Sequence, residues 1–82
     1  MKNKEELTKI VIAAVDEVMD LSEFPIDADF QSGLGMDSLD CVEFIMAVER
    51  DLNILIDDKV AEHLHTIEQT VEHLLTLPEN EK

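Results

Sequence analysis

The amino-acid sequence predicts an all-α fold: a small four-helix bundle of three longer helices and one short helix, with a long loop between the first and second helices. Two observations support this prediction. Apolar residues recur at helical spacing in three separate segments, and no stretch alternates apolar and polar residues over a useful strand length. Because 82 residues have room for one hydrophobic core, we expect a single domain over residues 1–82.

The first predicted helix runs from about Lys4 to Met19 and carries a single apolar stripe. Its members are Leu7, Ile10, Val11, Ala14, Val15 and Val18. Residues 20–36 contain Pro25 and both glycines, so they are predicted to form a loop. The loop also contains large apolar side chains that we expect to anchor it in the core, namely Phe24, Ile26, Phe30 and Leu34.

The second predicted helix, from Ser38 to about Asp51, carries two apolar stripes instead of one. The core stripe consists of Cys41, Phe44, Ile45, Val48 and Leu52. The second stripe consists of Leu39, Val42 and Met46, and it is edged by Glu43, Glu49 and Arg50. Either both stripes are buried, or the second stripe is exposed and meets partner proteins.

Two shorter elements complete the predicted bundle. Asp57 is a suitable N-cap for a helix of about two turns. The last helix begins at Thr66, where Thr66 and Gln69 form a capping-box pattern, and it stops at Pro78. Its expected apolar stripe is Ile67, Val71, Leu74 and Leu75.

The composition is strongly acidic, with 20 Asp and Glu residues against six Lys and Arg and a formal net charge of −14. Residues 23–62 alone hold 11 acidic and two basic residues. This charge repels phosphate backbones and anionic membranes, and no apolar run approaches the roughly 20 residues of a membrane span. We therefore expect no nucleic-acid partner and no membrane insertion. The acidity indicates either a solubility device or a docking surface for basic partners.

Cys41 is the only cysteine, so an internal disulfide is impossible. The N-terminus turns directly into an amphipathic pattern without the apolar region of a signal peptide. Both observations favour the reducing cytoplasm. Cys41 itself is expected to be a small buried hydrophobic residue, because neighbouring acids oppose a reactive thiolate.

The segment Gly35-Met36-Asp37-Ser38-Leu39-Asp40 contains the most informative chemistry. It places Ser38 in the first turn of a helix, directly after a loop that contains glycine. Unsatisfied N–H groups and the helix dipole there favour an anion, so a phosphate attached to the Ser38 hydroxyl would be stabilised. The alternative is that Ser38 or Asp37 is only an N-cap.

The sequence resembles the acyl carrier protein family over nearly its full length. Asp27–Phe30 and Leu34–Asp40 look like the family's loop and its Asp-Ser-Leu signature. Val42–Glu49 resembles its second helix, and Ile56–Asp58 resembles the start of its third helix.

This resemblance implies that Ser38 carries 4′-phosphopantetheine through a phosphodiester, with Asp37 and Leu39 flanking it as part of the cofactor-binding signature. A magnesium-dependent phosphopantetheinyl transferase would install the group from coenzyme A. The thiol of the arm would hold acyl intermediates as thioesters for the enzymes of fatty-acid synthesis. The protein itself would be no enzyme, with no catalytic residue and no metal site.

The resemblance also implies partners and a place for the acyl chain. Acyl-carrier synthases, reductases and acyltransferases with basic patches would dock on a monomer of this protein. The implied docking residues are Leu39, Asp40, Val42, Glu43, Met46 and Glu49. The implied acyl cavity is lined by Phe44, Ile45 and Val48.

Three departures from the usual family pattern leave a second pathway open. Arg50 stands where fatty-acid carriers usually have an acid, Ser32-Gly33 replaces a common acidic pair, and the proline that often precedes Asp57 is absent. The alternative function is a specialised carrier for polyketide, lipid-modification or another secondary pathway.

Two more distant alternatives concern metal binding and hydrolysis. Asp27-Ala28-Asp29 opens like the loop of a calcium-binding protein, but Ser32 and Ser38 occupy positions that need glycine and glutamate. A hydrolase using Ser38 would need a nearby base, whereas His63, His65 and His73 all lie in the last third of the chain. We expect these histidines to be surface residues.

Overall fold

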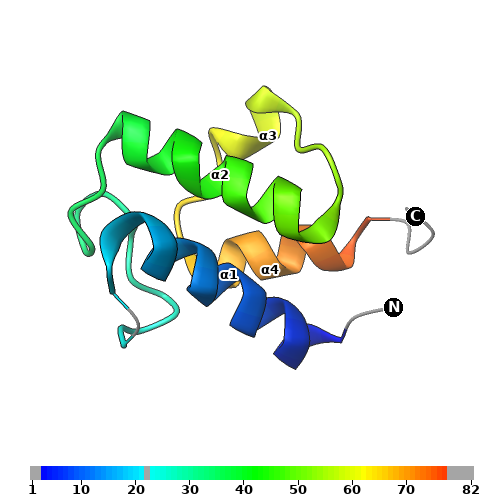
Figure 1. The fold of residues 1–82 in the computed structure, drawn as a ribbon, viewed down its shortest axis with the longest axis horizontal. Helices are drawn as coiled ribbons and strands as arrows, with labels where there is room; N and C mark the ends of the chain where they lie inside the picture. Colours follow the sequence, from blue (N-terminus) through cyan, green and yellow to red (C-terminus); the bar gives the residue numbers. More distant parts are fainter. Residues whose placement is uncertain (1–2, 22, 78–82) are drawn as a thin grey trace.

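The computed structural model describes residues 3–21 and 23–77, and within them it contains four helices and no strand. The helices are α1 (Lys4–Met19), α2 (Ser38–Leu52), α3 (Asp58–Ala61) and α4 (Ile67–Leu75). The all-α prediction is therefore confirmed. In Figure 1, the loop of residues 20–36 lies at the opposite end of the bundle from the start of α1 and the end of α4.

Each helix begins at a polar residue whose side chain accepts a backbone N–H of the first turn. These caps are Asn3, Asp37, Asp57 and Thr66. The predicted capping box at Thr66 is only half correct. Thr66 Oγ1 accepts the Gln69 N–H over 3.0 Å, but Gln69 Oε1 accepts the N–H of His65, one residue before the cap, over 2.8 Å. The hydrogen bond from the His65 N–H to Gln69 Oε1 therefore stabilises the connection to α3 as well as the start of α4.

The first two helices end in the left-handed conformation, at Asp20 with φ 60° and at Asn53 with φ 57°. Asp and Asn tolerate this conformation better than other side chains. The second helix thus extends one residue beyond the predicted Asp51. The predicted stop at Pro78 lies outside the described residues.

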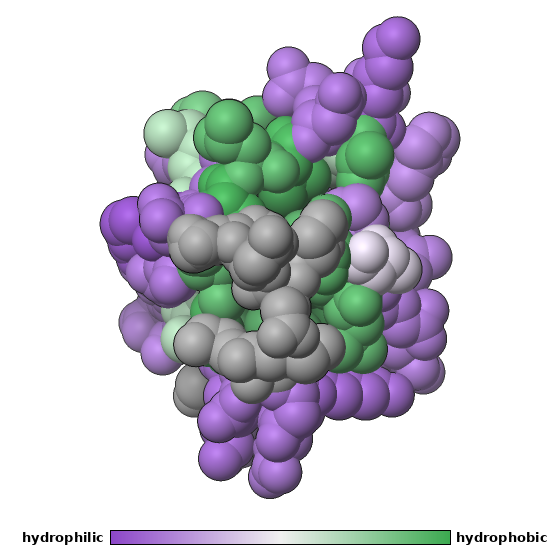
Figure 2. All heavy atoms as spheres, turned by 90° about the vertical axis from the view of Figure 1, so that its right-hand side faces the viewer, coloured by the Kyte–Doolittle hydropathy of each residue, from purple (hydrophilic) through white to green (hydrophobic). Residues whose placement is uncertain are grey.

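The core forms where α1 packs against both α2 and α4, its two close helix partners. Its fully enclosed side chains come from all three helices and from the first loop. Phe30 of the loop meets Phe44 of α2 edge to face, with ring centroids 4.8 Å apart. On the face of the molecule drawn in Figure 2, hydrophobic residues lie on the inner part and hydrophilic residues lie along most of the edge. No helix in the described part of the chain is long and apolar enough to cross a membrane.

The first loop is anchored by fewer side chains than predicted, and partly by its backbone. Phe30 is buried and Phe24 and Leu34 are half-buried, but the predicted anchor Ile26 is 42% exposed. Ile26 holds the loop through its carbonyl, which accepts the N–H of Glu68 in α4. A backbone hydrogen bond of this kind leaves no pattern in side-chain type, so the prediction assigned the anchoring to the wrong group.

Two further predictions need correction in the last third of the chain. Helix α3 is a single turn instead of two, and none of its residues is buried. In α4 the buried stripe includes Thr70, whereas Leu75 is 38% exposed. Thr70 is buried without a polar penalty because its hydroxyl donates to the Thr66 carbonyl over 2.9 Å.

Candidate functional site

Ser38 is the first residue of α2, and its side chain is exposed. The neighbouring acids form the cap of this helix. Asp37 Oδ1 accepts the Asp40 N–H over 2.9 Å, and Asp40 Oδ2 accepts the Asp37 N–H over 3.2 Å. Of the two candidate N-caps, Ser38 and Asp37, the one that caps α2 is Asp37. The Ser38 side chain is not required for the cap. The arrangement leaves a primary hydroxyl at the positive end of a 15-residue helix.

The loop before Ser38 has a defined shape that depends on Asp29 and Gly33. Asp29 Oδ1 accepts the N–H groups of Gln31 and Ser32, and these bonds, that of Ser32 above all, lower the pKa of Asp29. A Cβ atom on Gly33 would lie 2.7 Å from the Asp29 carbonyl oxygen, so the turn requires glycine. Gly35 adopts φ +77°, a conformation that L side chains rarely take.

Cys41 lies one turn after Ser38 and is half-buried. Burial raises the pKa of its thiol, and the negative charges of Asp40, Asp37 and Asp29 raise it further. The thiol is therefore protonated at neutral pH and chemically quiet.

The second stripe of α2 faces the solvent. Leu39 is 64% exposed, Val42 53% and Met46 60%. Glu43, between them in sequence, is also exposed. The helical pattern left open whether this stripe is buried or exposed, and the structure shows that it is exposed. The core stripe of the same helix has Phe44 and Val48 fully enclosed and Cys41, Ile45 and Leu52 half-buried, and the core also includes Ala47, which the prediction missed.

Glu49, like Asp40 and unlike the exposed Glu43, is half-buried, and its carboxylate accepts a backbone N–H. Its Oε2 accepts the N–H of Ile56, which lies in the connection between α2 and α3, over 2.7 Å. Arg50, the next residue, instead pairs with Glu17 of α1.

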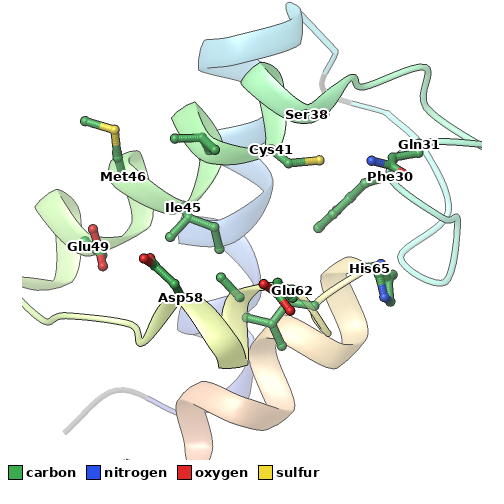
Figure 3. Close-up of a pocket in the computed structure, with 13 residues that line it drawn as sticks. Phe30, Gln31, Ser38, Cys41, Ile45, Met46, Glu49, Asp58, Glu62 and His65 are labelled. Carbon is green, nitrogen blue, oxygen red and sulfur yellow. The ribbon is translucent and has the colours of Figure 1, made fainter.

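A pocket of about 650 Å³ lies beside Ser38, between α2 and the segment containing α3. Figure 3 shows Ser38 and Cys41 toward one end of it and Met46, Glu49 and Asp58 toward the other. Of the three residues expected in an acyl cavity, only Ile45 lines this pocket. Phe44 and Val48 are instead enclosed in the core, 1% and 0% exposed.

Several lining residues were absent from the sequence-based site. These are Phe30, Gln31, Asp58, Ala61, Glu62, Leu64 and His65. They come from the first loop and from the segment around α3, which the fold brings opposite α2. Their juxtaposition depends on a hydrogen bond between the Phe30 N–H and the His65 carbonyl, 2.7 Å long, which no helical periodicity predicts.

Comparison with known families identifies the family of the chain. The model of the family described as "Phosphopantetheine attachment site" matches residues 6–74, which is most of the chain. The chain belongs to the acyl carrier protein family. As a member, this carrier holds acyl groups on a covalently bound 4′-phosphopantetheine.

Three curated relatives support this assignment. The carrier is 37% identical over 81 residues to a mitochondrial acyl carrier protein of Neurospora crassa, an alignment that covers 96% of the chain and 60% of the relative. It is 39% identical over 77 residues to an acyl carrier protein of Cyanidium caldarium, covering 92% and 90%. It is 41% identical over 76 residues to one of Buchnera aphidicola, covering 90% and 91%.

The residues around Ser38 suit such a group. Phosphopantetheine supplies a thiol that forms thioesters with acyl groups. The exposed Ser38 hydroxyl offers an attachment point, and the start of α2 directs N–H groups toward an attached phosphate. The adjoining pocket has apolar side chains of α2 in one of its walls, including Cys41, Ile45 and Met46.

Proposed function

We propose that Ser38 is the residue that carries 4′-phosphopantetheine, and that the protein presents acyl intermediates of fatty-acid synthesis without catalysing a reaction itself. The observation that supports this most strongly is the exposed Ser38 hydroxyl at the first residue of α2, beside the pocket. The Asp37–Asp40 capping box keeps this turn formed while leaving the hydroxyl available.

Partner enzymes are proposed to dock on the exposed stripe Leu39, Val42 and Met46, with Glu43 as an electrostatic guide. Apolar side chains in the middle of an acidic surface suit partners with an apolar patch surrounded by Lys and Arg. These partners are a phosphopantetheinyl transferase and the synthases, reductases and acyltransferases of the pathway. Asp40 and Glu49 were also expected to dock partners. Because both are half-buried and their carboxylates accept backbone N–H groups, we leave them out of this docking surface.

The pocket between α2 and α3 is proposed to receive the acyl chain. Its apolar walls along α2 would remove chain methylenes from water, at about 0.8 kcal/mol for each fully buried CH₂. We further propose that the carrier acts as a monomer in the cytoplasm. A specialised pathway is the second candidate, because Arg50 replaces an acidic residue on α2 and is paired with Glu17 of α1.

The test is an intact-mass measurement after incubation with coenzyme A, magnesium and a phosphopantetheinyl transferase. The wild-type chain should gain one phosphopantetheine group, and Ser38→Ala should gain none while keeping its helical circular dichroism. Ser32→Ala is the matched control, because it removes an exposed hydroxyl from the preceding loop. Loading of Ser38→Ala would refute the assignment.

A further inference from the structure

Glu49 holds the connection between α2 and α3 with both its backbone and its side chain. Its carbonyl accepts the N–H groups of Asn53, at the C-cap, and of Ile54. Its carboxylate accepts the N–H of Ile56 over 2.7 Å. A charged acceptor makes a stronger hydrogen bond than a neutral one, and partial burial protects this bond from competing water.

The bonded residue determines where α3 lies. Ile56 is 6% exposed and belongs to the core, and the next residue, Asp57, caps α3 through the Lys59 N–H over 2.8 Å. The helix itself adds only the half-buried Val60 and Ala61, which pack against the core. It is one turn long, none of its residues is buried, and it forms no close helix pair of the kind that α1 forms with α2 and α4.

The same segment forms one wall of the pocket, which is lined there by Asp58, Ala61 and Glu62. Glu49 lies on the α2 side of the pocket, toward the end farther from Ser38 (Figure 3). Eleven residues of helix separate Ser38 from Glu49, about 16 Å along the helix axis. The Glu49–Ile56 bond therefore joins α2 to the connection that leads into the α3 wall, toward the far end of the pocket.

We propose that Glu49 is a positioning residue that fixes the α3 wall, and thereby determines how well the pocket encloses an acyl chain carried on the arm. This inference rests on the proposed attachment at Ser38 and on the pocket as the place of the chain. It assigns to Glu49 a role different from electrostatic docking. With the bond removed, Ile56 and Asp57 lose their tie to α2, and the α3 wall can move outward.

The first measurement needs no cofactor and uses amide hydrogen exchange of the unloaded chain. In Glu49→Ala, the amides of Ile56 and of residues 58–62 should exchange about tenfold faster than in wild type, because one charge-assisted bond is lost. Glu49→Gln keeps an acceptor oxygen and should remain within about threefold. Glu72→Ala and Glu72→Gln are matched controls, since they make the same changes at an exposed helical position, on α4, that does not line the pocket.

The second measurement uses the chain loaded with an octanoyl thioester and follows its cleavage by hydroxylamine. Glu49→Ala should lose protection, with cleavage several-fold faster than in wild type, while the Glu72 variants match wild type. A butyryl thioester, with less chain to enclose, should show a smaller difference. Melting curves of each variant keep a general loss of stability separate from a local movement of α3.

Equal exchange at residues 56–62 and equal cleavage rates in Glu49→Ala and wild type would overturn the proposal. Faster exchange with unchanged octanoyl cleavage would also overturn it, because the wall would then move without affecting the chain. Should Glu49→Ala fail to fold, Glu49→Asp replaces it in both measurements, because its shorter side chain withdraws the carboxylate from the Ile56 N–H. Wild-type behaviour of Glu49→Asp in both measurements would then reject the role. Failure of the attachment proposal is distinguishable, since it would show as a missing phosphopantetheine mass on the wild-type chain.

Discussion

Arg50 of α2 and Glu17 of α1 form a bidentate ion pair, with Nη1–Oε2 and Nη2–Oε1 distances of 3.0 and 2.7 Å. Arg50 Nε also donates to Asp51 over 3.0 Å. The pair joins the two helices on a surface that is otherwise strongly acidic. Position 50 thus has a structural role between helices, besides departing from the usual acidic residue of fatty-acid carriers.

We predict that Glu17→Gln or Arg50→Gln lowers the melting temperature at neutral pH and low salt. The decrease should be modest, because at least half of each side chain is exposed and water screens the ion pair. The hydrogen bond from Arg50 lowers the pKa of Glu17 below its usual 4.5. The contribution of the pair is therefore fully present above pH 4.5 and is lost as the pH falls through the lowered pKa. Melting curves of the single and double variants against pH measure this coupling. A coupling that persists unchanged in strong acid would contradict it.

Asp37 allows the role of the cap to be separated from the role of charge. Asp37→Ala should reduce the free energy of unfolding by about 1 kcal/mol, because the capping box is lost and the turn containing Ser38 frays. Asp37→Asn keeps a side-chain acceptor and should stay close to wild type in stability. Urea unfolding together with the rate of phosphopantetheine loading tests both variants. Slow loading of Asp37→Asn at wild-type stability would show that the negative charge itself is needed.

Gly33 should be the least replaceable residue of the first loop. Gly33→Ala forces a Cβ atom against the Asp29 carbonyl oxygen, 2.7 Å away, so the turn must open. We expect a loss of about 1–3 kcal/mol in the free energy of unfolding, measured with urea. Gln31→Ala, at an exposed neighbouring side chain, is the control and should change stability little. An equally stable Gly33→Ala variant would mean that the turn has another accessible shape.

The three long helices were predictable because their stability depends on apolar stripes and capping residues, which are local in sequence. The predicted start of α1 at Lys4 and of α2 at Ser38 agree with the structure for this reason. Helix α3 was predicted too long. None of its residues is buried, so no buried apolar stripe sets where it ends. The pocket was only partly predictable. Ile45 follows from the stripe, whereas His65 and Glu62 reach the site through the tertiary fold alone.

The role of Glu49 could not be predicted from its position on the helical wheel, where it resembles Glu43 as an acid beside the second stripe. The difference arises because the chain turns back after Asn53 and brings the Ile56 N–H to the Glu49 carboxylate. Side-chain periodicity contains no information about such a return of the backbone.

Glu43 should be the clearest electrostatic contact of the docking surface. Glu43→Lys reverses an exposed charge beside Val42. It should weaken binding to the phosphopantetheinyl transferase on the order of tenfold at low salt. Because the side chain lies away from the core, the stability of the fold should hardly change. The difference in affinity should shrink at high salt. Affinity titrations at two salt concentrations test this, with Glu72→Lys at an exposed position of α4 as the charge-matched control. Equal weakening in both variants would indicate a general effect of net charge.

The attachment of the arm to Ser38 is the central claim, and site-resolved mass spectrometry of the protein purified from its native host tests it most directly. Proteolysis followed by fragmentation assigns the added mass to one residue, and the intact thioester reveals the acyl group. The account predicts phosphopantetheine on Ser38, with an acyl chain of fatty-acid synthesis on a fraction of the molecules. Phosphopantetheine on any other residue, or a chain that is never modified, would contradict it.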